Sequence, residues 1–226
     1  MPTIEQVELP QDVRVKIERT VDHLHSEFET RFSREQVSEV VHDSANRLAA
    51  NSTVADNIPL LAYRFARERL QAITRRQGAG TAGGCDVVLV SLSGGGRGQL
   101  AAALTASLSD HRVSVHSAGT AVYAEIDPGV RIVLVEIGID ADEPFARPVT
   151  EEIIEGANVI VTMGHSVGTI KIPDGVRHED WRIGDPIGAP IDEIRRVRAD
   201  IEYRVRALLD SLNVPASSNM TAQAGE

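Results

Sequence analysis

The sequence predicts a small all-α bundle followed by an α/β domain with an open parallel sheet and helices on both faces. Apolar residues recur at three- and four-residue intervals up to about residue 77, whereas short apolar runs alternate with helical segments after a glycine-rich stretch. Such alternation is typical of parallel strands, because each strand needs a crossover connection to reach the next. We expect a helical bundle at 1–77, a linker at 78–85, an α/β domain at 86–212 and a disordered tail at 213–226.

The bundle is predicted to contain three helices. The first follows Pro10, and the second begins after Ser33, whose hydroxyl forms a capping-box pattern with Gln36. The third starts near Asp56 and carries Pro59 in its first turn. The residues expected to face inward are Val13, Ile17, Val21, Leu24 and Phe28 in the first helix, Val37, Val40, Val41 and Leu48 in the second, and Leu60, Leu61, Phe65 and Leu70 in the third.

The second part of the chain alternates strands and helices. The expected elements are strands at 87–90, 113–115 and 159–162, and helices at about 97–109, 128–137, 150–156 and 192–211. Because the strand runs are almost entirely apolar, we expect them to be buried on both faces of the sheet.

The composition excludes several classes of function. The net charge of −10 and the 4% aromatic content argue against a nucleic-acid surface, which needs a basic stripe and stacking rings. The lack of a run of about 18 apolar residues predicts no membrane span, and the lack of a charged and apolar leader predicts a cytoplasmic location. A locally basic helix is expected to form a solvated or acid-paired face with Arg64, Arg67, Arg69, Arg75 and Arg76.

The single cysteine, Cys85, excludes an intrachain disulfide and a metal site made of cysteine ligands. It lies at the expected start of a strand with no arginine placed to stabilise a thiolate, so we expect a structural role. The histidines are scattered, and His23 and His25 point to different faces of a helix. We therefore expect neither a metal nor a cofactor.

The most informative segment follows the first apolar run of the second part. Three successive glycines, Gly94, Gly95 and Gly96, allow backbone N–H groups to turn inward at a helix N-terminus, where anions bind. Arg97 adds a planar guanidinium that can donate two hydrogen bonds to one oxyanion. The segment therefore predicts an oxyanion-binding loop.

Several later segments accompany this loop. They are, in order, Ser117-Ala118-Gly119-Thr120, Glu136 to Asp140, Val161-Thr162-Met163-Gly164 and Glu179 to Pro186. Together with the Ser91-x5-Arg97 spacing they resemble the low-molecular-weight tyrosine phosphatase and arsenate reductase superfamily over about 86–212. The helical front, around 60–70, resembles the N-terminal three-helix domain of some actinobacterial arsenate reductase-like proteins. The resemblance implies a parallel sheet of four strands.

The resemblance also implies roles for single residues. In the family a loop cysteine attacks phosphorus or arsenic, the loop arginine and backbone amides hold the oxygens, and the aspartate of an Asp-Pro pair is the general acid. These catalytic roles fall on Ser91, on Arg97 with the loop amides, and on Asp185. The implied oxyanion-binding set is Ser91, Leu92, Ser93, Gly94, Gly95, Gly96, Arg97 and Gly98.

The family nucleophile is replaced by Ser91, and a serine hydroxyl needs a dedicated base where a thiol does not. His111, His116 and His165 cannot be placed beside it from the sequence. Chemistry of the Ser-His-Asp kind is therefore disfavoured.

Other departures from the family pattern also indicate a loss of thiol chemistry. Gly94 and Gly98 stand where the family usually has an asparagine that braces the loop and a serine that donates to the thiolate. Residues 165–169 contain no cysteine, although thiol-relay arsenate reductases have cysteines there, and Ile187 stands where phosphatases have aromatic residues that hold an aryl ring. These changes together indicate a coordinated loss of thiol chemistry rather than one engineered substitution.

Three functional hypotheses stay open. The first is a catalytically degenerate protein that binds phosphate, sulfate or arsenate. The second is an active arsenate reductase or tyrosine phosphatase, in which Ser91 and Asp185 take part. The third is an interaction protein that forms a homodimer through its helical part. No nucleic-acid or membrane partner is expected.

Overall fold

The computed structural model of this chain divides into two compact units. The described residues are 9–50, 57–77, 85–93, 96–121, 126–140, 147–164 and 170–217, without the side chains of Leu92, Ser93, Thr120 and Ala121. The first unit comprises Met1–Thr81 with Thr150–Gly156, and the second comprises Ala82–Val149 with Ala157–Glu226. Within the described ranges, no helix is long and apolar enough to cross a membrane.

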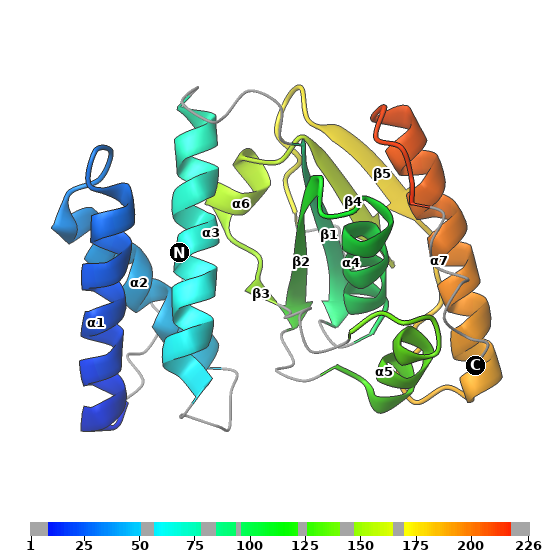
Figure 1. Cartoon of the computed structure of the whole chain (residues 1–226), viewed down its shortest axis with the longest axis horizontal. Helices are drawn as coiled ribbons and strands as arrows, with labels where there is room; N and C mark the ends of the chain where they lie inside the picture. The colour runs from blue at the N-terminus through cyan, green and yellow to red at the C-terminus, as the bar shows by residue number, and fades with distance from the viewer. Residues whose placement is uncertain are drawn as a thin grey trace. The chain divides into compact units, whose positions relative to one another are not determined.

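The described part of the first unit is helical (Figure 1). It contains α1 (Gln11–Phe28), α2 (Arg34–Ala49), α3 (Ile58–Arg76) and α6 (Glu151–Glu155). The capping box predicted at the start of α2 is confirmed. Ser33 Oγ accepts a hydrogen bond from the Gln36 N–H at 3.3 Å, and Gln36 Oε1 accepts one from the Ser33 N–H at 2.9 Å. The cap satisfies backbone donors that a helix start leaves unpaired, which is why α2 begins here.

The inward faces predicted for α1 and α2 are largely confirmed, whereas one residue predicted for α3 is wrong. Leu60 is 56% exposed, although Phe65 and Leu70 are buried. The buried stripe of α3 includes Ile58, Ala62, Phe65, Ala66, Arg69 and Leu70. With about 3.6 residues per turn, Leu60 falls on the opposite side of the helix from this stripe. The predicted start at Asp56 lies outside the described residues.

Arg69 joins three helices of the first unit. Its side chain is buried and reaches Asp43 Oδ2 through Nη1 at 2.7 Å and Glu152 Oε1 through Nη2 at 2.8 Å. Nη1 also donates to Ser44 Oγ at 2.9 Å. Because a buried cation is costly unless it is paired, these contacts fix α2 and α6 against α3. The acid-paired interpretation of this basic helix is confirmed for Arg69 and also for Arg67, which pairs with Glu27.

The placement of α6 differs from the sequence prediction, which assigned 150–156 to the α/β domain. In the structure this segment belongs to the first unit. Glu152 pairs with Arg69 and Glu155 pairs with Arg76, while a Cβ on Gly156 would lie 3.0 Å from Ala72 Cβ. Ion pairs and close packing with α3 therefore decide which unit α6 joins.

The second unit is built on a parallel sheet, which confirms the predicted fold class. Its described strands are β1 (Cys85–Ser93), β2 (Val113–Ala121), β3 (Arg147–Pro148), β4 (Val159–Met163) and β5 (Arg177–Trp181). They are arranged in the order β3-β2-β1-β4-β5, with β1 at the centre. The sheet thus has one strand more than the implied four, the two-residue β3 at its edge. β5 has no apolar run, since an edge strand with the sequence Arg-His-Glu-Asp-Trp buries little.

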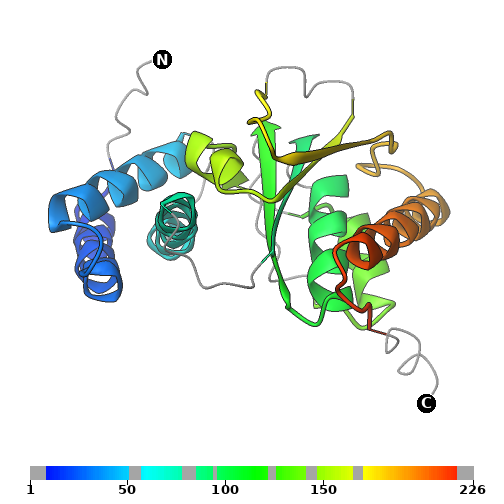
Figure 2. The same cartoon turned by 90° about the horizontal axis from the view of Figure 1, so that it is seen from above.

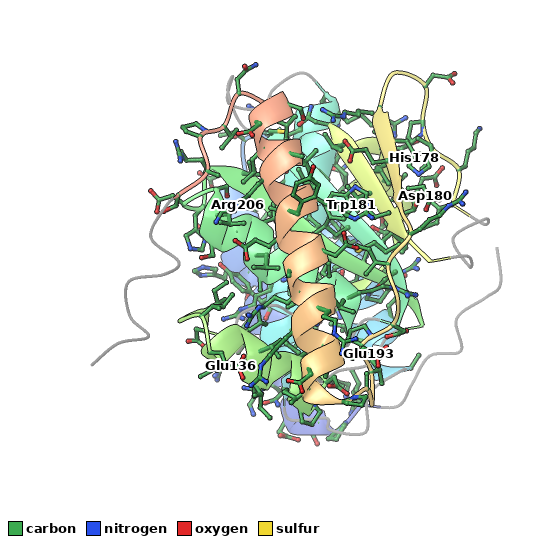
Figure 3. All side chains as sticks on the ribbon, turned by 90° about the vertical axis from the view of Figure 1, so that its right-hand side faces the viewer. Glu136, His178, Asp180, Trp181, Glu193 and Arg206 are labelled. Carbon is green, nitrogen blue, oxygen red and sulfur yellow. The ribbon has the colours of Figure 1, made fainter. Side chains whose placement is uncertain are left out.

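Helices α4 (Arg97–Leu108), α5 (Pro128–Val135) and α7 (Ile191–Ser211) pack against one face of this sheet (Figure 2). Val87 and Leu89 of β1 point into the shared core, because alternate residues of a strand face the same side. Arg195 of α7 pairs with Glu136, which follows α5 and lies beside the N-terminal half of α7 (Figure 3). This packing holds the N-terminus of α4 next to the carboxyl end of β1.

The predicted disordered tail, 213–226, is wrong for its first part, because residues 213–217 pack against the second unit. The Ser217 N–H donates to the Leu108 carbonyl at 2.8 Å, and Arg112 donates to the Pro215 carbonyl at 2.6 Å. Val214 and Ala216 pack against the core of the second unit. Two apolar residues are too few to show periodicity, which is why the sequence did not reveal this contact. The rest of the predicted tail, 218–226, lies outside the described residues.

Replacing Arg69 by methionine should lower the free energy of unfolding by about 3 kcal/mol, because it leaves partly buried carboxylates without their shared cation. Urea denaturation of the full chain measures this change. The matched control is Arg64→Met on the exposed side of the same helix, which should cost less than about 0.5 kcal/mol. Equal losses in the two variants would show that Arg69 contributes only what a surface arginine does.

The difference between wild type and Arg69→Met should also shrink in acid. Burial raises the pKa of the Asp43 and Glu152 carboxyls, but other interactions outweigh burial, so both pKa values lie below their ordinary range. For Asp43 these are hydrogen bonds and charges of Arg47 and Arg69, and for Glu152 they are mainly the hydrogen bond and charge of Arg69. A lowered folded-state pKa contributes stability above the unfolded-state pKa of about 4, and this stability is lost as pH falls through the folded-state pKa. A difference that persists unchanged below about pH 3 would exclude this account.

Candidate functional site

Ser91 lies at the carboxyl end of the central strand. It pairs in register with Gly119 of β2 and Met163 of β4, and it is fully buried. In open parallel sheets, ligands bind beyond the carboxyl ends of the strands, where the crossover loops begin. Ser91 therefore occupies the position at which such a site is expected.

The start of α4 lies against Ser91. Gly96 is the N-cap, and a Cβ on Gly98 would lie 2.6 Å from Ser91 Oγ and 3.3 Å from Ser117 Oγ. A distance of 2.6 Å is shorter than any normal carbon–oxygen contact, so the Ser91 hydroxyl occupies space that a side chain at position 98 would need. Of the remaining predicted loop residues, Gly94 and Gly95 lie outside the described residues. Leu92 and Ser93 are described as backbone only, at the end of β1.

Arg97 is buried at the first position of α4, with 7% of its surface exposed. Its Nη1 donates to the Ile183 carbonyl at 3.0 Å, and its Nη2 lies 3.8 Å from Asp185 Oδ2. The guanidinium passes close to Gly164, where a Cβ would lie 2.4 Å from Nη2. The structure thus brings Arg97 and Asp185 together as the resemblance implies, with Ile183 and Gly164 as additional neighbours.

The hydrogen bonding of Arg97 is incomplete within the described part of the chain. Its Nε–H is buried and has no acceptor there, and the buried Ser117 hydroxyl also has no partner there. The Asp185 carboxylate stays beyond hydrogen-bond distance of Nη2 and is 40% exposed. A buried donor without an acceptor costs roughly 1–3 kcal/mol. An oxygen of a bound anion would remove this cost.

Asp127 is a residue of the site that the sequence analysis missed. Its Oδ1 accepts hydrogen bonds from the N–H groups of Gly129 at 2.8 Å and Val130 at 3.2 Å, which caps α5. Its Oδ2 accepts one from the Gly188 N–H at 3.3 Å. Aspartate before proline is a local signal for a helix cap, and it was available in the sequence. The bond to Gly188 has no local signal, because the two residues are far apart in the chain.

Neither His111 nor His116 lies beside Ser91. His116 lies 3.4 Å from Asp86, and both side chains point to the sheet face opposite Ser91 because strand residues alternate. His111 is exposed in the turn before β2, at the amino end of that strand. His165 lies outside the described residues.

Cys85 is also distant from the loop. It opens β1 opposite Val113, six residues before Ser91, which corresponds to about 20 Å along an extended strand. Burial and the neighbouring Asp86 carboxylate raise the pKa of its thiol. Both effects disfavour the thiolate that a nucleophile requires. Among the described residues, no group of three His, Cys, Asp or Glu side chains is placed to hold a metal ion.

Two family models match this chain. The model for the N-terminal domain of protein-tyrosine-phosphatase-like proteins covers residues 17–74. The model for low molecular weight phosphotyrosine protein phosphatase covers residues 86–217, which is more than half of the 226 residues. The second match includes Ser91, Arg97 and Asp185.

Several individual proteins are also similar to this chain in sequence or in structure. The chain is 30% identical over 94 residues to the arsenate reductase of Staphylococcus aureus strain Newman, covering 41% of this chain and 71% of that protein. A thioredoxin-dependent arsenate reductase of Corynebacterium glutamicum superposes with a TM-score of 0.78 at 27% identity, covering 87% of this chain and 96% of that one. A cysteine-to-serine mutant of the YwlE arginine phosphatase, with a phosphorylated active-site serine, superposes with a TM-score of 0.50 at 26% identity, covering 57% and 95%.

Gly164→Ala should cost more stability than Gly175→Ala. Both glycines have positive φ, +93° and +83°, so each alanine bears a backbone strain of about 1 kcal/mol. Only at Gly164 would the new Cβ collide with a buried, hydrogen-bonded guanidinium, because nothing lies within 4 Å of one at Gly175. We expect an additional loss of at least about 1 kcal/mol in the free energy of unfolding. Equal losses would mean that Arg97 moves aside without cost.

Proposed function

Because this chain belongs to the low molecular weight phosphotyrosine protein phosphatase family, we propose that it binds phosphate, arsenate or a similar tetrahedral oxyanion at the start of α4 without thiol catalysis. The observation that supports this most directly is the incomplete neutralisation of Arg97. Its guanidinium is buried, yet its carboxylate neighbour is 3.8 Å away. An oxyanion beside Arg97 would supply both the missing negative charge and an acceptor for Nε–H.

Arg69 is a second buried arginine of this chain and can be compared with Arg97. It is equally buried and also has an Nε–H without an acceptor among the described residues. Its terminal nitrogens, however, lie 2.7 and 2.8 Å from two carboxylates, so its charge is compensated within the protein. The contrast indicates that Arg69 has a structural role and that Arg97 retains charge for a ligand.

A serine at position 91 favours oxyanion binding over catalytic turnover. A serine hydroxyl is protonated at neutral pH and becomes a nucleophile only beside a base, and neither His111 nor His116 is placed to act as one. Gly98 provides no hydroxyl to stabilise an anion at Ser91 Oγ. These features support a site that holds an oxyanion and leaves it chemically unchanged.

Arsenate reduction is the activity named for two of the similar proteins. Reducing arsenate to arsenite takes two electrons, which thiols supply as they are oxidised, and a serine hydroxyl cannot supply them. Cys85 lies at the other end of β1 with a raised thiol pKa, so it is poorly placed to substitute. The YwlE mutant supports only that a site of this family accommodates a phosphoryl group, because its active-site serine carries that group covalently.

Isothermal titration calorimetry with inorganic phosphate, sulfate and arsenate tests the proposal. Wild type should bind in the millimolar range or tighter, and Arg97→Ala should weaken binding at least about tenfold because it removes a charge-assisted donor. Arg97→Lys should give an intermediate loss, since lysine keeps the charge without the planar pair of donors.

The matched control is Arg204→Ala, which removes an arginine that pairs with Asp200 on α7. It should leave phosphate binding within about twofold of wild type, because it lies outside the proposed site. Urea denaturation of each variant distinguishes lost binding from lost folding. The proposal would be refuted if titration of wild type with millimolar phosphate gave no heat of binding.

Restoring the thiol should restore part of the chemistry. Ser91→Cys should reduce arsenate with dithiothreitol at least about tenfold faster than wild type, because Arg97 and the helix N-terminus favour a thiolate there. The matched control is Ser109→Cys, a buried serine after α4 whose replacement should give no gain. Wild type reducing arsenate as fast as Ser91→Cys would instead establish an active enzyme that does not need the thiol.

A further inference from the structure

Helix α7 exposes a large aromatic side chain on its outer face. Tyr203 is 74% exposed, whereas Ile201 and Val205, two positions to either side, are buried. Because successive residues of a helix are turned by about 100°, Tyr203 points away from the buried stripe. In Figure 3, α7 runs along the side of the second unit that faces the viewer. One exposed aromatic residue is ordinary on a protein surface, so the residues around Tyr203 decide whether it belongs to an interface.

Small residues flank Tyr203 on this outer face. Ala199 lies about one helical turn before it and Ala207 about one turn after it, and both are exposed. The distance between the axes of two packed helices is about 8–10 Å and is set by the side chains at the contact. A second helix can therefore come close to α7 on either side of the tyrosine ring.

The charged residues of the outer face are placed symmetrically about Tyr203, with opposite signs. Arg196 lies seven residues before it and Asp210 seven residues after it. Asp200 lies three residues before it and Arg206 three residues after it. Residues three or seven positions from Tyr203 share its side of the helix, since about 3.6 residues make one turn. Each charge therefore has a charge of opposite sign at the same distance on the other side of Tyr203.

Arg196 and Asp210 have exposed side chains that form no ion pair and no hydrogen bond within the described part of the chain. By contrast, Asp200 and Arg206 each pair with a charged residue of their own helix, at 3.0 and 2.9 Å. The two charges farthest from Tyr203 are thus the ones left for a partner.

These positions match those of a second copy of α7 that runs antiparallel to the first. A two-fold axis perpendicular to the helix at Tyr203 brings the residue n positions before Tyr203 opposite the residue n positions after it in the second copy. Arg196 then faces Asp210 of the second copy, about 10 Å from the axis at a rise of about 1.5 Å per residue. Asp200 faces Arg206 in the same way, and the two tyrosines meet at the axis. Because the symmetry repeats each pair, opposite charges surround the tyrosines on all sides.

We propose that α7 forms a homodimer interface in which two copies of the helix pack antiparallel about Tyr203. A parallel pair would instead bring each charge opposite its own copy, which is repulsive. A single pair of helices buries less area than the roughly 1,200 Å² at which stable complexes begin, so the dimer is weak and reversible, with a Kd in the micromolar range. The inference is independent of the proposed function, because loss of oxyanion binding would leave the α7 surface unchanged.

Sedimentation equilibrium of the full chain from about 5 to about 500 µM, at an ionic strength of about 0.15 M, tests this inference. The average mass of wild type should rise from that of a monomer toward that of a dimer. Tyr203→Ala should weaken the dimer at least about tenfold, because it removes the central aromatic residue of both copies. The matched control is Val135→Ala, an exposed apolar residue on α5, which should leave Kd within about twofold of wild type.

Charge reversal tests the antiparallel pairing. Arg196→Glu and Asp210→Arg should each weaken the dimer at least about fivefold, because each replaces two attractions by two repulsions. The double variant with both changes should bring Kd back to within about threefold of wild type, since the pair is then reversed in sign. Arg14→Glu, an exposed arginine on α1 with the same change of charge, is the matched control and should have less than about a twofold effect.

A wild type that stays monomeric over the whole concentration range would overturn the inference. A dimer that all α7 variants leave unchanged would overturn it too and would locate the contact elsewhere, such as in the helical first unit. If the double variant were as weak as the single ones, the charges would not pair antiparallel and the interface would be wrong. Urea denaturation of each variant separates loss of the dimer from loss of folding.

Discussion

The burial of the Arg97 guanidinium is the constraint on which the rest of the site depends. A cation removed from water is tolerated only where neighbouring groups accept its hydrogen bonds and offset its charge. The Ile183 carbonyl, the Asp185 carboxylate and the Gly164 backbone all come close to it. The segments after β4 and β5 are therefore held at the carboxyl end of β1. The same arrangement leaves Arg97 farther from its carboxylate neighbour than Arg69 is from its two, and for this reason the proposed oxyanion site is centred on Arg97.

Positions 91 and 98 are physically coupled. Ser91 Oγ would lie 2.6 Å from a Cβ on Gly98, so the hydroxyl and a side chain at 98 compete for the same space. A side chain at 98 would therefore require the Ser91 hydroxyl to shift. The two departures that the resemblance implies, at Ser91 and Gly98, therefore lie side by side in the structure.

The first unit uses a buried arginine for a different purpose. Arg69 reaches carboxylates on α2 and α6, so α6 packs with the helical bundle although its chain neighbours belong to the sheet. Leaving either carboxylate without its cation would be costly at this degree of burial. The fold of the first unit thus depends on a residue contributed from far along the chain.

The sequence by itself determined the features that depend on local pattern and residue chemistry. These include the helix periodicity, the cap at Ser33, the buried central strands, and a serine, Ser91, at the position that the family resemblance assigns to the nucleophile. Only the tertiary structure decided that α6 joins the first unit, that Asp127 anchors Gly188, and that Ile187 lies on the N-cap of α4. The physical reason is that periodicity and caps arise among residues a few positions apart. Packing and ion pairing arise among residues that only folding brings together.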